Sequence, residues 1–392
     1  MTLPFTLLLP PEPVAELTRP AITAPAPRQT SFGLVAGRLG EGTVRVVVQV
    51  GQTTKVDTPT WERSFRFQVA LPPRDVTVRV IAYDAAGNSK SAAVTPVFGL
   101  PATAYPAPIL GSEDGVLADQ IRSLARAYPG TAAVFVQDLR TGQGAAWNAR
   151  ARFQAASTLK LGIAIEVLRV LRGLPKPGTR LATLFWRMLV YSDNLAANNL
   201  EIWLGGSVYA GADRVSATLR ALHLNDSRMW GGYILGTAST RPIPLRVESQ
   251  PPYYTFGKYT SAWDLARIHR YLHRAAAGQG ALLGLAGHFT AADARYMLYV
   301  LAHVRDPGKI DRYIGTRSDV AVLHKAGWII HARHDSGLVF WHGGAFVVTV
   351  MTWNGVAAGV SSDILAGRVA QAALRRFSAT PPPAPRASRL PS

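Results

Sequence analysis

The hydrophobic pattern of the chain changes at a proline-containing segment, residues 100–112. Before it, residues 31–99 alternate apolar and polar side chains with a period of two, which is typical of half-buried strands. Such runs include Val46, Phe67 and Val78, and turns with Gly, Pro and Asp separate them. Short alternating strands broken by turns predict a small all-β sandwich, and the prolines predict a linker after it.

Beyond the linker, residues 113–378 combine helical and strand periodicity, which predicts an α+β domain with a nested helical part. The predicted helices lie at about 117–125, 157–172, 181–190, 195–203, 212–222, 262–276 and 363–377, and the predicted strands at 132–137, 320–324, 336–341 and 345–353. A turn is expected at 140–144. Residues 1–30 and 379–392 are rich in Pro and Ala without periodicity, so we predict disordered tails there.

Composition restricts the chemistry. The chain has no cysteine, which excludes disulfides, zinc–thiolate sites and a cysteine nucleophile. The 42 Lys and Arg residues against 24 Asp and Glu give a net charge of +18. We interpret this charge as the result of a bias toward arginine that keeps the protein soluble. The alternative is that the charge attracts anionic cell-wall polymers. We find no nucleic-acid motif and expect no integral membrane span. The cysteine-free composition fits an exported protein, extracellular or at the cell surface, although the N-terminal apolar run is a poor signal sequence.

Ser157 and Lys160 form the most informative local pattern. On a helix, residues three apart share one face, with Cβ atoms about 5–6 Å apart. A lysine at that spacing can take the proton of a serine hydroxyl if its pKa is lowered. Lysine occurs only seven times in the chain, so its presence at such a position is informative.

Two further motifs follow in order, Ser192-Asp193-Asn194 and Lys325-Ala326-Gly327. With the segments 153–161, 191–198 and 260–266, they make residues 113–378 resemble a class A β-lactamase within the wider penicillin-binding and serine-hydrolase superfamily. The resemblance implies a five-stranded antiparallel sheet flanked by helices, a helical subdomain, and an active site in the groove between them. The segment 82–88 resembles a turn of bacterial immunoglobulin-like modules, with an unrelated β-module as the alternative.

The resemblance assigns a role to each motif residue. Ser157 would be the nucleophile and Lys160 its base, while Ser192 would pass a proton to the leaving nitrogen. Asn194 would donate its amide to the acylamide of the substrate, and Lys325 would attract the substrate carboxylate. We expect Asp193 to be structural, as the cap of the following helix.

The third motif departs from the family pattern, because Ala326 stands where Thr or Ser is usual. A hydroxyl that would help to bind the substrate carboxylate is missing. We expect Gly327 to let substrate approach the strand backbone. The oxyanion hole would use the backbone N–H groups of Ser157 and Trp328.

A second departure concerns deacylation. Class A enzymes have a glutamate in the loop after the second motif, which activates water, whereas the matching stretch 230–233 has no carboxylate. Glu248 could fold over the site as a deacylation base. We expect Glu201 to face solvent and Glu166 to lie on the face of its helix opposite Ser157.

These residues support three hypotheses. The first is a β-lactamase-type serine hydrolase in which Ser157 is acylated by a β-lactam or a related amide and then released by water. The second is a cell-wall D-alanyl-D-alanine peptidase or an esterase, with slow release of β-lactams. The third is a non-catalytic protein that binds cell-wall material. We expect no cofactor and no metal, because His331, His334 and His342 lack a supporting acidic pattern beyond Asp335, and His324 points away from Lys325.

Overall fold

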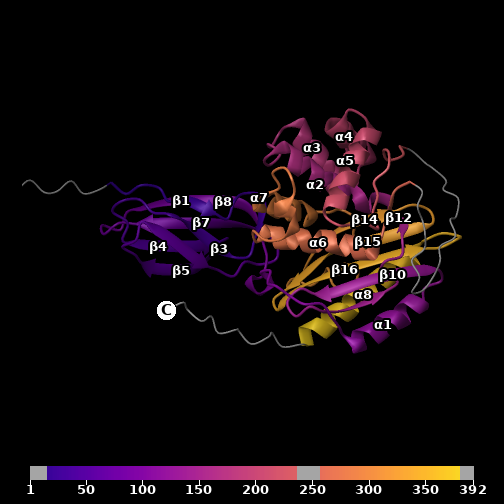
Figure 1. Ribbon diagram of the computed structural model, residues 1–392. Coiled ribbons are helices and arrows are strands. Elements are labelled where there is room, and N and C mark those ends of the chain that lie inside the picture. Colours follow the sequence, from indigo (N-terminus) through magenta and orange to yellow (C-terminus); the bar gives the residue numbers. More distant parts are fainter. Residues whose placement is uncertain (1–15, 236–256, 380–392) are drawn as a thin grey trace, which may run out of the picture.

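The computed structural model describes residues 16–235 and 257–379. These residues form an all-β part followed by a larger α+β part (Figure 1). This arrangement confirms the predicted fold class.

The first part is a sandwich of two β-sheets, with strand orders β1-β3-β6 and β2-β8-β7-β4-β5. Alternating side chains pack between the sheets as predicted, so that Val46, Val48 and Val78 are buried while Arg66 is exposed. The strands are β1 (Ala21–Ala24), β2 (Gln29–Ser31), β3 (Leu34–Arg38), β4 (Arg45–Val50), β5 (Thr53–Pro59), β6 (Ser64–Gln68), β7 (Asp75–Tyr83) and β8 (Ser89–Gly99).

Two segments differ from the sequence-based expectation. Strand β1 and the first two residues of β2 lie within residues 1–30, which we predicted to be a tail, so the first strand of the described residues begins at Ala21. Strands of four and three residues are too short to show a clear period. The segment 100–112 contains the 3-10 turn η1 (Ala102–Ala104), and the strand β9 (Ser112–Glu113) begins at its end. Residues 1–15 and 380–392 lie outside the described ranges.

The connecting segment and the sandwich pack against the larger part. Leu100 and Ala104 are buried in its core, and strand β2 lies against helix α7 (Ala291–Leu301). His303 places its Nε2 2.9 Å from the Asp75 carboxylate of the sandwich. The two parts therefore share a packed interface as well as a covalent connection.

The sheet of the larger part has the order β14-β15-β16-β10-β11-β9. Its first five strands are antiparallel, as the resemblance implied, and the short β9 adds a parallel edge to β11. Helices α1 and α8 cover one face and α6 covers the other (Figure 1). The strands not yet given are β10 (Thr131–Asp138), β11 (Gln143–Trp147), β14 (Ala321–Trp328), β15 (Ala332–Trp341) and β16 (Gly344–Trp353).

A helical layer lies above this sheet in Figure 1, with α2 at its centre. Most of α2 is buried, which fits its apolar sequence. Side-chain caps on polar residues begin the other helices of the layer, for example Thr179 before α3 and Ser207 before α5. The helices not yet given are α1 (Gly115–Arg126), α2 (Lys160–Leu171), α3 (Arg180–Val190), α4 (Asn194–Gly205), α5 (Val208–Ala221), α6 (Ala262–Ala276) and α8 (Val360–Ala379), with a short 3-10 turn η3 (Ala281–Gly284).

In the larger part, sequence periodicity missed several elements, among them β11 and α7. Residue 143 begins the strand β11, whereas we predicted a turn through residue 144. Helix α7 was also not predicted, because buried side chains lie on all its sides and leave little amphipathic contrast. Its start has a local signal, since Thr290 and Asp293 form a capping box.

Candidate active site

The segment with Ser157 is held between a small sheet and a buried helix. Strand β12 (Phe153–Gln154) pairs with β13 (Tyr259–Thr260), and the 3-10 turn η2 (Ala156–Leu159) then leads into α2. Ala156 has a φ of 48°, in the left-handed region that side chains disfavour. This sharp turn leaves Ser157 half-buried at the start of the helix.

Lys160 is fully buried and is held by the second motif. Its Nζ donates to the Ser192 carbonyl at 2.5 Å, to Asn194 Oδ1 at 2.7 Å and to Ser192 Oγ at 3.4 Å. Burial, assisted by the charge of Lys325, lowers the pKa of Lys160 to about 6. A lysine with such a pKa is mostly an uncharged amine at neutral pH.

Lys325 approaches the same serine from strand β14. Its Nζ donates to Ser192 Oγ at 2.9 Å and to the Ala326 carbonyl at 2.7 Å. The side chain is fully buried, and burial lowers the pKa of Lys325 to about 8. Ser192 Oγ thus lies between the two amines.

The second motif forms the start of helix α4. Ser192 has a φ of 57°, and Asp193 then caps the helix by accepting from the Ala196 backbone N–H at 3.0 Å. This agrees with the structural role that we expected for Asp193. Asn194 directs its oxygen to Lys160, while its Nδ2 donates to the Ile234 carbonyl at 2.9 Å.

The third motif runs directly against the nucleophile turn. A Cβ at Gly327 would lie 2.6 Å from the Ser157 backbone nitrogen and 2.7 Å from that of Thr158, so only glycine fits. Ala326 is fully buried, and Trp328 has 60% of its surface exposed at the end of the strand. Gly327 is therefore needed for the contact between the strand and η2, a role that we did not predict.

Sequence reasoning missed two residues beside Lys160. The Tyr233 ring centroid lies 4.5 Å from Lys160 Nζ and 4.6 Å from Lys258 Nζ. Lys258 donates to the carbonyls of Trp230 at 2.7 Å and Gly232 at 2.5 Å, which anchors the loop that contains Tyr233. The scarcity of lysine was a signal that could have identified Lys258. This lysine directly precedes the β13 strand, which supports the nucleophile segment.

Our prediction that Glu201 faces solvent is wrong. Glu201 is fully buried on α4, and neither carboxyl oxygen has a hydrogen-bond partner among the described residues. Burial raises the pKa of Glu201 to about 8 in spite of the nearby charges of Lys258 and Lys160, so the carboxyl is mostly protonated at neutral pH. The prediction failed because α5 covers this face, with Gly211 lying directly on the Glu201 backbone.

Glu166 does not enter the described site. Glu166 is fully buried on α2, where its carboxylate accepts from Arg169 at 2.7 Å, from Thr218 at 2.7 Å and from Arg214 at 3.3 Å. These partners give it a structural role away from Ser157. Glu248 lies outside the described residues.

The histidines form separate structural contacts. His324 Nδ1 lies 2.9 Å from the Asp335 carboxylate, on the face of β14 opposite Lys325. His331 and His334 bond to backbone carbonyls, and His342 is exposed. Within residues 16–235 and 257–379, no group of three or more His, Asp or Glu side chains could hold a metal ion.

Every helix within residues 16–235 and 257–379 is too short or too polar to cross a membrane.

Comparisons with known proteins identify the family and support the fold. A family model described as the β-lactamase enzyme family matches residues 116–173 and 170–377. No curated protein matches the chain.

Two solved structures illustrate the likeness. A β-lactamase from Sphaerobacter thermophilus DSM 20745 has a TM-score of 0.52 at 21% identity, covering 69% of this chain and 100% of its own. PBP-A has a TM-score of 0.54 at 19% identity, covering 72% of this chain and 100% of its own. At such identities the structural likeness supports the fold alone. The family model, however, matches more than half of the chain, and this protein therefore belongs to the β-lactamase enzyme family.

Proposed function

We propose that this protein is a serine hydrolase in which Ser157 attacks the amide carbonyl of a β-lactam and Lys160 accepts the serine proton. The observation that supports this proposal most is the buried amine of Lys160, whose pKa of about 6 leaves it able to accept a proton at neutral pH. No hydrogen bond joins Ser157 Oγ to Lys160 Nζ among the described residues. Catalytic hydrogen bonds often tighten only when substrate binds.

The remaining motif residues would complete the acyl transfer. Ser192 lies between the two amines, so it can relay the proton from Lys160 to the nitrogen that leaves when the amide bond breaks. Lys325 adds positive charge for the substrate carboxylate. The backbone N–H groups of Ser157 and Trp328 would stabilise the oxyanion of the tetrahedral intermediate.

We further propose that the acyl-enzyme persists. In class A enzymes a glutamate carboxylate activates the deacylating water, and Glu201 cannot act in this way because it is buried and mostly protonated at neutral pH. A structure of a PBP-A variant is described as an acyl-enzyme complex with penicillin G, at 19% identity and a TM-score of 0.52, covering 70% of this chain and 100% of its own. Penicillin G is therefore a suitable probe, with a cell-wall peptide amide as the alternative natural substrate.

The test is a time course of intact protein mass after mixing with penicillin G. We expect an adduct of one penicillin that forms on the native chain, decays slowly, and is absent from Ser157→Ala. Rapid decay with consumption of the drug would instead indicate β-lactamase turnover and direct attention to Glu248. No adduct on the native chain would refute the proposed acylation and favour the binding-protein hypothesis.

We also propose that the protein acts outside the cytoplasm, at the cell wall, where its proposed substrates occur.

A further inference from the structure

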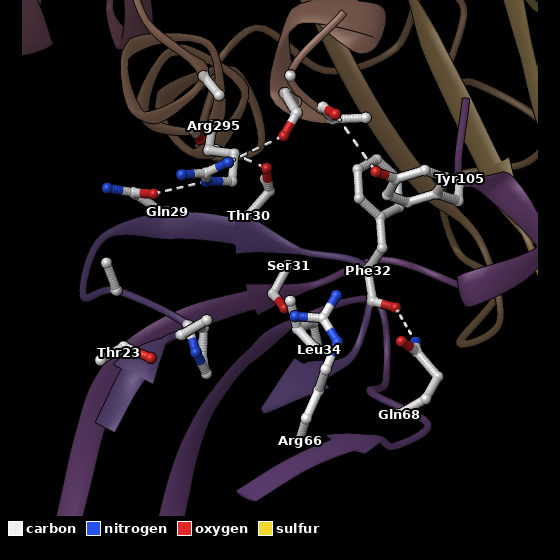
Figure 2. A pocket seen from close by; sticks show the side chains of 17 residues that line it. Thr23, Gln29, Thr30, Ser31, Phe32, Leu34, Arg66, Gln68, Tyr105 and Arg295 are labelled. Carbon is white, nitrogen blue, oxygen red and sulfur yellow. Dashed lines mark hydrogen bonds between the residues drawn. The ribbon is translucent and has the colours of Figure 1, made fainter. Parts of the chain in front are cut away.

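A cleft lies between the sandwich and the larger part, far from the motif residues. It has a volume of about 540 Å³, within the size range of small-molecule sites. One wall comes from the β1–β2 loop and strand β6, and the other from the end of α6 and the start of α7 (Figure 2). Helix α6 begins beside the strand β13 of the nucleophile segment, and its 15 residues span about 22 Å before reaching the cleft.

The cleft is lined by two arginines, Arg66 from the sandwich and Arg295 from α7, and by no acidic residue. Arg295 Nε donates to Gln29 Oε1 at 2.8 Å, and its Nη1 donates to the Ala276 carbonyl at 3.0 Å. Both acceptors are neutral, and burial lowers the pKa of Arg295. No carboxylate of the described residues bonds to this guanidinium, so a bound anion would be favourable there.

Asp293 offsets part of this charge, because its carboxylate raises the pKa of Arg295 against the effect of burial, but it does not bond to the guanidinium. Asp293 directs its Oδ2 to the backbone and hydroxyl of Thr290, as the capping box at the start of α7. Arg66 is exposed on the sandwich side, where it forms no hydrogen bond or ion pair with any described residue. In Figure 2 its guanidinium extends toward Ser31 and Leu34, whereas Arg295 lies on the other side of the strand that carries Thr30.

The walls are already in place and are largely apolar. Tyr105 meets Phe32 edge to face with ring centroids 5.5 Å apart, and its hydroxyl donates to the Ala277 carbonyl at 3.3 Å. The Gln68 side chain donates to the Phe32 carbonyl, which anchors β6 against this wall. Small residues such as Ala24 leave the rest of the cleft open. The cleft thus combines apolar walls with two cations contributed by different parts of the chain.

We infer that this cleft binds an anionic ligand, a short peptide whose carboxylates pair with Arg66 and Arg295 while its apolar side chains lie against Phe32 and Tyr105. Planar guanidinium groups suit carboxylates because they can donate two parallel hydrogen bonds. Ligand recognition here needs both parts of the chain, which gives the sandwich a binding role separate from acyl transfer.

The test is isothermal titration of the full chain with the tripeptide acetyl-Ala-Glu-Ala, which has two carboxylates and no amine. Its neutral counterpart acetyl-Ala-Gln-Ala-amide and inorganic phosphate are titrated in parallel. We expect the acidic tripeptide alone to bind, and salt to weaken its binding. Binding of the neutral peptide with equal affinity would overturn the electrostatic argument. Binding of phosphate without the tripeptide would overturn the carboxylate assignment, and no binding of any probe would overturn the site.

Variants locate the ligand. We expect Arg66→Gln and Arg295→Gln each to weaken tripeptide binding at least tenfold, while Arg79→Gln, at another exposed arginine of the sandwich, leaves it unchanged. Equal losses in all three variants would refute a specific site. Because Arg66 is exposed and outside the packed core, its variant stays informative even if Arg295→Gln unfolds the chain.

Tripeptide binding before and after acylation distinguishes a ligand in this cleft from a ligand at the proposed active site. We expect the tripeptide to bind equally to the native chain, to Ser157→Ala and to penicillin-treated protein, whether or not an adduct forms. Loss of tripeptide binding upon acylation would place the peptide in the catalytic groove and overturn the inference.

Discussion

Replacing Lys160 by methionine tests whether the fold holds this amine uncharged at a cost in stability. Burial and the charge of Lys325 lower the pKa of Lys160 from 10.5 to about 6. In the unfolded chain the lysine regains its usual pKa of 10.5 and is ionised at pH 7. Folding at pH 7 therefore requires it to lose a proton, against a difference of about 3.5 units between that pKa and the pH. At about 1.36 kcal/mol per unit, the native protein loses about 5 kcal/mol of unfolding free energy.

Methionine removes this loss but also removes hydrogen bonds. The Ser192 carbonyl and Asn194 Oδ1 lose their donor, which costs about 1–3 kcal/mol for buried acceptors. We therefore expect Lys160→Met to be more stable than the native protein by about 2 kcal/mol at pH 7 and to form no penicillin adduct.

The pH dependence has a definite sign. Between pH 6 and 10.5 the folded protein binds fewer protons at Lys160 than the unfolded chain, so native stability rises with pH. The advantage of Lys160→Met should be largest at pH 6 and shrink by up to about 1.4 kcal/mol per pH unit above it.

Urea unfolding followed by tryptophan fluorescence at pH 6, 7, 8 and 9 measures this difference. Lys176→Met is the control, because Lys176 is exposed and its surroundings change little on unfolding. A stability difference that does not vary with pH, or a variant that is less stable at every pH, would refute the reasoning about Lys160.

Three further predictions follow from single contacts. Gly327→Ala should slow penicillin acylation at least tenfold, since its Cβ would displace the Ser157 backbone. Intact-mass kinetics measure this rate. The control Gly284→Ala, whose Cβ would meet no other atom, should match the native rate. Glu166→Gln should lower the free energy of unfolding by about 3 kcal/mol because it breaks a buried ionic network, while folded protein keeps its acylation rate. Glu201→Gln should gain stability over the native chain as pH rises from 4.5 to 8, since the native fold forces the carboxyl to keep its proton; a gain that falls with pH in urea unfolding would contradict this.

Local sequence determined most elements of the larger domain. Helix α6 has the bounds 262–276 that its apolar spacing predicted, and a capping serine, Ser261, precedes it. The placement of Ser157 three residues before Lys160 at the start of a helix is equally local. Such features depend on neighbours within one or two turns of the chain, which is why a pattern in the sequence can predict them.

Strand composition had less power at β1, β2 and β11, because strands of three to five residues are too short to show a clear period. β1 pairs with β3 and β11 pairs with β10. Whether a short segment becomes a strand is decided by such partners rather than by its own residues.

The sequence by itself determined which residue types could perform acyl transfer and in what order they occur. Only the tertiary structure decided that Lys160, Ser192 and Lys325 meet, since they come from a helix, a helix start and a strand that are far apart in the chain. It also decided that Glu201 is buried and that Tyr233 lies beside Lys160. The pKa values of such groups follow from burial and from charges brought close by folding, and neither is a property of local sequence.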